Sequence, residues 1–220
     1  MTFSPASHPT DGIDVGSEFD RQVAIIRRLG YAGIAGIDEQ LLAEAAAALR
    51  IDVLARIGST VAVATSGRAP FVLVVPAALL PAAKSMPLTS LRGRPGFVSP
   101  DTADIAGFTP IPGLDIPART LYALLDVRRG EEFCDVRPKD ALVSIRAAGR
   151  SPLTYDEGIA LLTHHPEMLE KNKCFSLSGS RCGDKRVPAL WISDRRPKLG
   201  WCWDGNPHTW LGSAHTAARC

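Results

Sequence analysis

The sequence of 220 residues has little of what marks several common protein classes. It carries no large basic excess, because 25 Lys and Arg side chains stand against 23 Asp and Glu side chains. This balance argues against a protein that coats nucleic acid, because such proteins usually carry a large basic excess. Apolar residues make up 45% and charged residues 22% of the chain, which excludes a collagen, a disordered chain and a coiled coil.

Long apolar runs and an export signal are also missing. The most apolar stretch, residues 69–83, is interrupted by Pro70, Pro76 and Pro81 and is too short to span a bilayer as a helix. The first 16 residues have neither a basic start nor an apolar core. We therefore expect a soluble, cytoplasmic protein with no membrane contact. Its five cysteines are expected to be thiols, metal ligands or core residues, since a disulfide framework belongs to exported proteins.

Signature motifs of the commonest enzyme classes are absent. The chain has no G-x-S-x-G, H-E-x-x-H, Walker loop or G-x-G-x-x-G motif. Their absence removes the commonest hydrolase, metalloprotease, NTPase and dehydrogenase interpretations. No cofactor is indicated by any motif, and whether the protein is an enzyme stays open at this point.

The local patterns that are present predict an α+β fold. Residues 1–16 are expected to be a disordered tail, and 17–220 a single domain in which 150–220 could form a sub-module. Ser17 is a candidate N-cap for the first of two N-terminal helices, which ends near residue 30. The second helix is expected to start at Asp38 and to end near residue 50. The T-x-x-E pattern of Thr154 and Glu157 predicts a capping box at the start of a later helix.

Strand patterns occupy the middle and the end of the chain. Short β-branched segments at 60–65 and 71–75 predict strands, and 122–127 with 132–136 predict a β-hairpin. A proline-dense region separates these two pairs, and Pro138 suits the first turn of a helix. Segments 174–177, 187–193 and 199–203 predict a C-terminal antiparallel β-rich module.

Side chains that carry chemistry are crowded into the last quarter of the chain. All four tryptophans, Trp191, Trp201, Trp203 and Trp210, fall in one 20-residue window. Four of the five cysteines and four of the five histidines lie beyond residue 160. Residues 171–198 contain eight basic and two acidic side chains, a local excess of +6 in a chain of net charge +2. Any functional site is therefore expected here.

One interpretation of this block is a metal site. Cys174, Cys182, Cys202 and His208 are the weak candidate ligands, because zinc prefers thiolates and imidazoles in a tetrahedron. Their spacing contains no C-x-x-C pair, so the structural alternative is a set of unrelated core thiols. We therefore predict no metal.

A second interpretation is a catalytic thiol. Cys182 lies in G-S-R-C-G-D-K-R, where Arg181, Lys185 and Arg186 would lower its pKa and favour the thiolate. His208 is the preferred candidate for an accompanying acid–base group. A cysteine in a basic turn is not catalytic by charge alone, so this role depends on geometry.

The third interpretation is a pocket for a small anionic or aromatic ligand. Arg181 and Arg186 would bind an anion, with Asp184 orienting either guanidinium. On a strand, Trp201 and Trp203 would point to one face and form a wall, with Cys202 on the other face. The structural alternative is that the indoles pack the core of a small sheet.

Three sequence blocks resemble an actinobacterial family of uncharacterised proteins, a domain of unknown function. They are G-R-S-P-L-T-Y-D-E-G-I-A-L-L-T-H-H-P, S-L-S-G-S-R-C-G-D-K-R-V-P-A-L-W-I-S and L-G-W-C-W-D-G-N-P-H-T-W-L-G-S-A. The resemblance implies a bacterial, intracellular protein of about this size. It assigns no catalytic role to any residue.

Together these observations favour a ligand-binding or enzymatic pocket built from the C-terminal block. The alternative, from another functional class, is a non-catalytic interaction module that uses a basic, Trp-rich face for a protein or nucleic-acid partner. The two differ in shape, because a pocket needs the side chains to converge on a hollow and a partner surface spreads them over a flat face.

Overall fold

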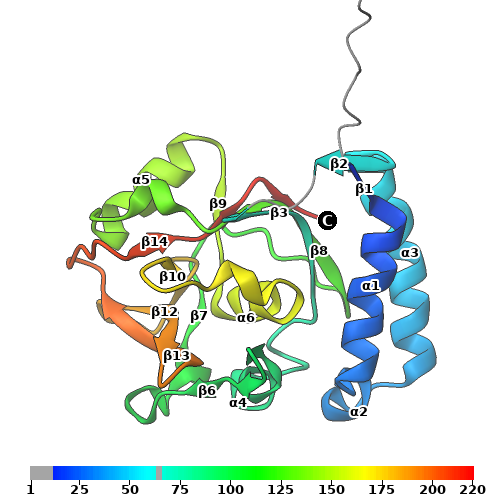
Figure 1. Ribbon diagram of the computed structural model, residues 1–220, viewed down its shortest axis with the longest axis horizontal. Coiled ribbons are helices and arrows are strands. Elements are labelled where there is room, and N and C mark those ends of the chain that lie inside the picture. The colour runs from blue at the N-terminus through cyan, green and yellow to red at the C-terminus, as the bar shows by residue number, and fades with distance from the viewer. Residues whose placement is uncertain (1–11, 63–65) are drawn as a thin grey trace, which may run out of the picture.

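The computed structural model describes residues 12–62 and 66–220 (Figure 1). The helices are α1 (Val15–Arg28), α2 (Tyr31–Ala35), α3 (Glu39–Ile57), α4 (Ala82–Ser85), α5 (Pro138–Ala147) and α6 (Tyr155–His164). Short 3-10 turns occur at Met86–Leu88, Pro100–Thr102, Ile105–Gly107, Glu131–Phe133 and Pro166–Met168. The fold class is α+β, as predicted.

The strands are β1 (Gly12–Asp14), β2 (Thr60–Ala62), β3 (Arg68–Val74), β4 (Ser90–Leu91), β5 (Arg94–Pro95), β6 (Phe97–Val98), β7 (Thr109–Pro110), β8 (Tyr122–Arg128), β9 (Ser151–Pro152), β10 (Cys174–Ser176), β11 (Ser180–Arg181), β12 (Arg186–Ser193), β13 (Arg196–Trp203), β14 (Leu211–Ser213), β15 (His215–Thr216) and β16 (Ala218–Arg219). Most of the predicted disordered tail, residues 1–11, lies outside the described part of the chain. Residues 12–16 form β1 and the first residues of α1, so the ordered structure begins before the predicted boundary.

The centre of the molecule is a sheet buried on both faces. It has the order β16-β8-β15-β9, and β3 pairs with β8 in antiparallel register. Side chains of β3 and β8 alternate between two hydrophobic clusters: Phe71 and Leu73 belong to one, Val72 and Val74 to the other. Alternation in a strand sends neighbouring side chains to opposite faces, so each face of this sheet is covered by another layer.

The N-terminal helices cover the first face. Figure 1 shows α1 and α3 side by side at one edge of the molecule, away from α5. Asp14 caps α1, because its carboxylate accepts a 2.7 Å hydrogen bond from the Ser17 backbone N–H; the predicted cap at Ser17 was three residues late. Asp38, the predicted start of the second helix, is the N-cap of α3, and the helix continues to Ile57, beyond the predicted end near residue 50. No helix of residues 12–62 and 66–220 combines the length and apolarity needed to cross a membrane.

The second face is covered by α6 and by a second sheet. The capping box is confirmed, with the Glu157 carboxylate accepting from the Thr154 backbone N–H at 2.8 Å. The second sheet has the order β14-β10-β12-β13-β6, in which β10–β12 and β12–β13 are antiparallel and the two outer pairs are parallel. Its strand β6 comes from the proline-dense middle, whereas β15 and β16 join the central sheet. Residues 150–220 therefore contribute to both sheets.

The predicted hairpin of 122–127 with 132–136 is wrong. β8 pairs instead with β3, β15 and β16, and residues after Gly130 form a 3-10 turn. Gly130 has φ +77°, and its backbone lies against that of Ser213, whose N–H donates to the Gly130 carbonyl at 3.2 Å. The apolar pattern of 122–127 is that of a central strand, and its partners are distant in sequence.

Candidate functional site

The hairpin of β12 and β13 positions the tryptophans. Asp194 and Arg195 form its turn with φ values of +53° and +60°, the left-handed backbone that matches the twist of a tight hairpin. Trp201 and Trp203 lie on one face of β13 as predicted: their ring centroids are 4.7 Å apart and their planes are inclined at 65°. Cys202 between them is buried.

The four indoles line one groove of about 330 Å³. Its lining residues are Ala189, Trp191, Trp201, Cys202, Trp203, Asn206, His208, Trp210 and Leu211. Trp203 is 45% exposed, so its ring is available to solvent at this groove. The register of β12 and β13 places Trp191 on the Cys202 face of the hairpin, opposite the face of Trp201 and Trp203, so the indoles line this groove from both faces of the hairpin.

Main-chain hydrogen bonds hold the segment that carries His208 and Trp210. The Asp135 N–H donates to the His208 carbonyl at 2.9 Å, and the Cys174 N–H donates to the Trp210 carbonyl at 3.0 Å. The rings of His208 and Trp210 have centroids 5.3 Å apart. Because this segment is tied to both β10 and the chain before α5, it forms a fixed wall of the groove.

The lining of the groove is aromatic and carries no Lys, Arg, Asp or Glu side chain. Asn206 and His208 supply the polar side-chain groups. Indole faces favour flat rings at stacking distance, and they favour cations as well. The arrangement therefore suits a planar ring that enters between indoles and meets a few hydrogen-bonding groups.

The structure does not place the two predicted arginines in this lining. Arg186 stacks over Trp201, with its guanidinium carbon 5.8 Å from the ring centroid, but its N–H groups are taken by carboxylates. It donates to Asp104 at 2.7 and 3.2 Å and to Asp184 at 2.8 Å. Arg181 donates to the carbonyls of Ser178 and Ser180, both at 2.9 Å. Asp184 thus orients Arg186 as expected, but the guanidinium is neutralised by its two partners.

The surroundings of Cys182 oppose the predicted thiolate. Partial burial raises the pKa of the thiol, and so does its hydrogen bond to the Asp184 carboxylate at 3.2 Å; Arg186 lowers it only in part. The direction is opposite to the one predicted from the basic neighbours. Cys182 is also absent from the groove lining, whereas His208 is part of it, so the groove does not bring the proposed nucleophile and its base together.

The weak metal candidates are not assembled into a site. Among residues 12–62 and 66–220, no three His, Cys, Asp or Glu side chains are grouped so that they could hold a metal ion. Cys174 hydrogen-bonds the Glu170 carbonyl at 3.6 Å, and burial raises the pKa of Cys202 to about 12. Both thiols behave as small core residues, which is the structural alternative given above.

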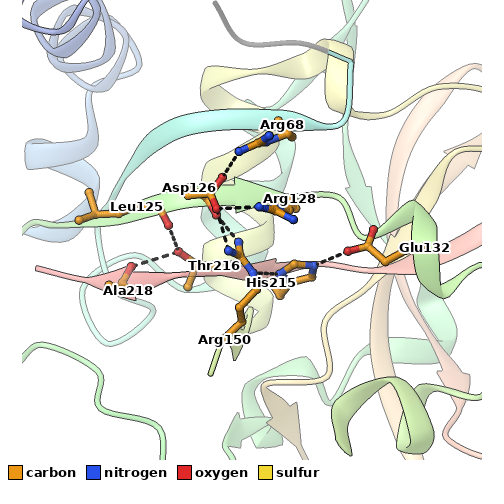
Figure 2. A network of polar contacts seen from close by, with 9 residues as sticks. All are labelled: Arg68, Leu125, Asp126, Arg128, Glu132, Arg150, His215, Thr216 and Ala218. Carbon is orange, nitrogen blue, oxygen red and sulfur yellow. Dashed lines mark hydrogen bonds and ion pairs between the residues drawn. The ribbon is translucent and has the colours of Figure 1, made fainter. Parts of the chain in front are cut away.

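A network of charges that the sequence did not indicate lies at the central sheet (Figure 2), with His215 buried and the other members partly exposed. The Asp126 carboxylate accepts hydrogen bonds from Arg150 at 2.7 Å, Arg68 at 2.9 Å and Arg128 at 3.2 Å. Arg150 also donates through Nε to His215 Nδ1 at 2.5 Å. The other ring nitrogen of His215 lies 2.9 Å from Glu132. Since Nδ1 accepts, the proton of neutral His215 is on Nε2 and faces Glu132.

The charges of this network stabilise one another. Burial alone would raise the pKa of Asp126, but hydrogen bonds from Arg150 and Arg68 hold it at about 2. Burial lowers the pKa of His215 below its usual value, against the opposing effect of Glu132. Asp126 has φ +46°, a backbone conformation that aspartate tolerates better than most residues. Figure 2 shows the network bridging β8, β15 and the chain before β9, so it reinforces the pairing of these strands within the central sheet.

An arginine-lined cleft of about 360 Å³ lies beside this network. Arg146, Arg150 and Arg219 line it together with Asp115 and Ser151. Arg150 is bound to Asp126, and Arg219 to Glu157, so two of its three guanidinium groups already have carboxylate partners. No local spacing pattern links these residues, which explains why sequence reasoning missed them.

Comparison with known proteins places the chain in a family. The model of a family of unknown function, DUF5701, matches residues 25–220. No curated protein and no solved structure matches the chain.

Proposed function

Because the chain belongs to the DUF5701 family of unknown function, we propose its function from the site alone: it binds a small ligand through a planar aromatic ring in the Trp groove. The observation that carries this proposal is the convergence of Trp191, Trp201, Trp203 and Trp210 on one hollow of about 330 Å³. Trp191 and Trp210 also pack against the main core cluster, so the core and the groove share these two indoles. From the resemblance of the three sequence blocks we also propose that the protein is an intracellular protein of an actinobacterium.

The polar side chains of the groove set the orientation of the ligand. Asn206 offers an amide, with both donor and acceptor groups, and His208 offers two ring nitrogens. We assign ligand contact to Trp203 and to His208, and we assign no chemical step to them. Trp201 supports Trp203 edge-on, and its indole N–H donates to the Asp101 carbonyl at 3.1 Å.

Removal of the exposed indole is the first test. With 2-quinolinone as a neutral bicyclic ligand, we expect Trp203→Ala to weaken binding about tenfold, because one stacking partner is lost. Trp203→Phe should retain most of the affinity. Isothermal titration calorimetry measures both, since it does not depend on tryptophan fluorescence.

Two controls give this test its meaning. Val143, 68% exposed on α5, provides a surface substitution outside the groove lining, and Val143→Ala should leave the affinity unchanged. The ring-saturated counterpart of 2-quinolinone has the same amide but no aromatic face, and it should bind more weakly. Equal binding of the saturated and aromatic compounds, or an unaffected Trp203→Ala variant, would refute the proposal and leave the alternative of a macromolecular partner surface.

A further inference from the structure

A row of alternating cations and aromatic rings borders the Trp groove. Trp191 lies directly opposite Lys198 on β13, and Lys198 lies opposite Phe97 on β6. The Lys198 ammonium is 5.1 Å from the ring centroid of Trp191 and 5.9 Å from that of Phe97. The Arg196 guanidinium lies over the same Phe97 ring at 4.6 Å. Because Trp191 also lines the groove, the row adjoins the groove at this ring.

Neither cation of this row is neutralised by a carboxylate. Within the described part of the chain, Lys198 and Arg196 form no ion pair, and the Arg196 Nε donates instead to the Pro95 carbonyl at 2.8 Å. The neighbouring cations differ, because Arg186 is bound to Asp104 and Asp184, and Lys173 lies 3.7 Å from Glu170. The basic excess of the segment is therefore left uncompensated at the edge of the groove.

Aromatic faces attract a cation, but they do not cancel its charge. An ammonium beside two rings is partly shielded from water and keeps its full attraction for an anion. Both Lys198 and Trp191 are half-buried, so an anion that reaches Lys198 next to a ring stacked in the groove would gain from both contacts.

We propose that the ligand of the Trp groove is an aromatic anion, whose charged group binds Lys198 and Arg196 while its ring lies between the indoles. The inference rests on the proposed function and adds the class of ligand and the residues that select it. Lys198 and Arg196, which have no carboxylate partner in the described part of the chain, thus take the role that the sequence predicted for Arg181 and Arg186.

A pair of compounds that differ only in charge tests this inference. We expect wild-type protein in low-salt buffer to bind 2-quinolinone-4-carboxylate about fivefold more tightly than neutral 2-quinolinone, the gain of one partly exposed ion pair. The advantage should disappear in Lys198→Gln, shrink in Arg196→Gln and persist in Lys198→Arg. About 1 M NaCl should remove it from the wild-type protein, because screening is then nearly complete.

Affinity for the neutral compound separates the two proposals. Arg56→Gln, a change of the same charge on α3, should keep the fivefold advantage. If neutral 2-quinolinone binds in the groove but the carboxylate binds no more tightly, or if Lys198→Gln keeps the advantage, the inference is wrong and the proposed function stands. If neither compound binds, the proposed function itself fails.

Discussion

Replacement of Arg219 by methionine should destabilise the protein by about 3–5 kcal/mol, the cost of breaking a buried ion pair and leaving one charge alone. The Arg219 guanidinium donates to both carboxylate oxygens of Glu157, at 2.6 and 2.8 Å. The Arg219 side chain is 5% exposed and that of Glu157 is fully buried. Tyr122 and the Thr154 N–H also donate to this carboxylate, but neither brings a positive charge.

Two matched variants isolate the cause of this loss. Arg186 is bound to two carboxylates in the same bidentate manner, but its partners are about half exposed, so Arg186→Met should cost only a small part of what Arg219→Met costs. The double variant Arg219→Met with Glu157→Gln removes the stranded charge and should recover part of the lost stability. Chemical denaturation measures all of these. Equal losses in the two arginine variants would contradict the assignment.

Lowering the pH from about 7.5 to 5 should destabilise the protein by about 2 kcal/mol through His164 alone. Burial holds the pKa of His164 at about 3, below its ordinary 6.5. In the unfolded chain this histidine takes up a proton below pH 6.5, whereas in the folded protein it stays neutral. The contribution of His164 to the free energy of unfolding is therefore fully present above pH 6.5 and is lost as the pH falls towards 3.

The geometry explains why His164 is neutral. Its Nε2 lies 3.0 Å from the Leu73 carbonyl, which makes Nε2 the protonated nitrogen, and Nδ1 is buried without a hydrogen-bond partner. A histidine in the last turn of a helix is favoured as a cation by the helix dipole, but at His164 burial outweighs that effect and keeps the ring neutral.

Unfolding curves at the two pH values test this prediction. His164→Gln should lose less stability between them than the wild-type protein does, by about the 2 kcal/mol given above, and Val143→Ala, an exposed change that removes no titratable group, should follow the wild-type protein. NMR titration of the His164 ring adds a measurement that needs no variant. Protonation of this ring near pH 6.5 in the folded protein would show that the assigned burial is wrong.

Sequence reasoning succeeded where the determining contacts are local. The Thr154 and Glu157 capping box, the helix start at Asp38 and the shared face of Trp201 and Trp203 each follow from residues that are close in sequence. These features depend on backbone geometry within one turn or one strand, so a single sequence contains the information.

Contacts between distant segments could not be predicted in this way. Arg150 and His215 are 65 residues apart, and Arg186 and Asp104 are 82 apart. The pattern of 122–127 indicated a strand correctly but gave no sign of its partners. Arg186 illustrates the same limit, because Asp104, one of the two carboxylates that bind it, comes from a segment far upstream.

The central claim is that the four tryptophans form one ligand groove, and the indole N–H signals of the folded protein test it most directly. Two-dimensional NMR during titration with 2-quinolinone should shift the signals of Trp191, Trp203 and Trp210 together with the amides of Asn206 and His208. The amides of Gly113 and Arg146 at the arginine-lined cleft should stay in place. Shifts concentrated at that cleft, or indole signals that do not move at saturating ligand, would contradict the account.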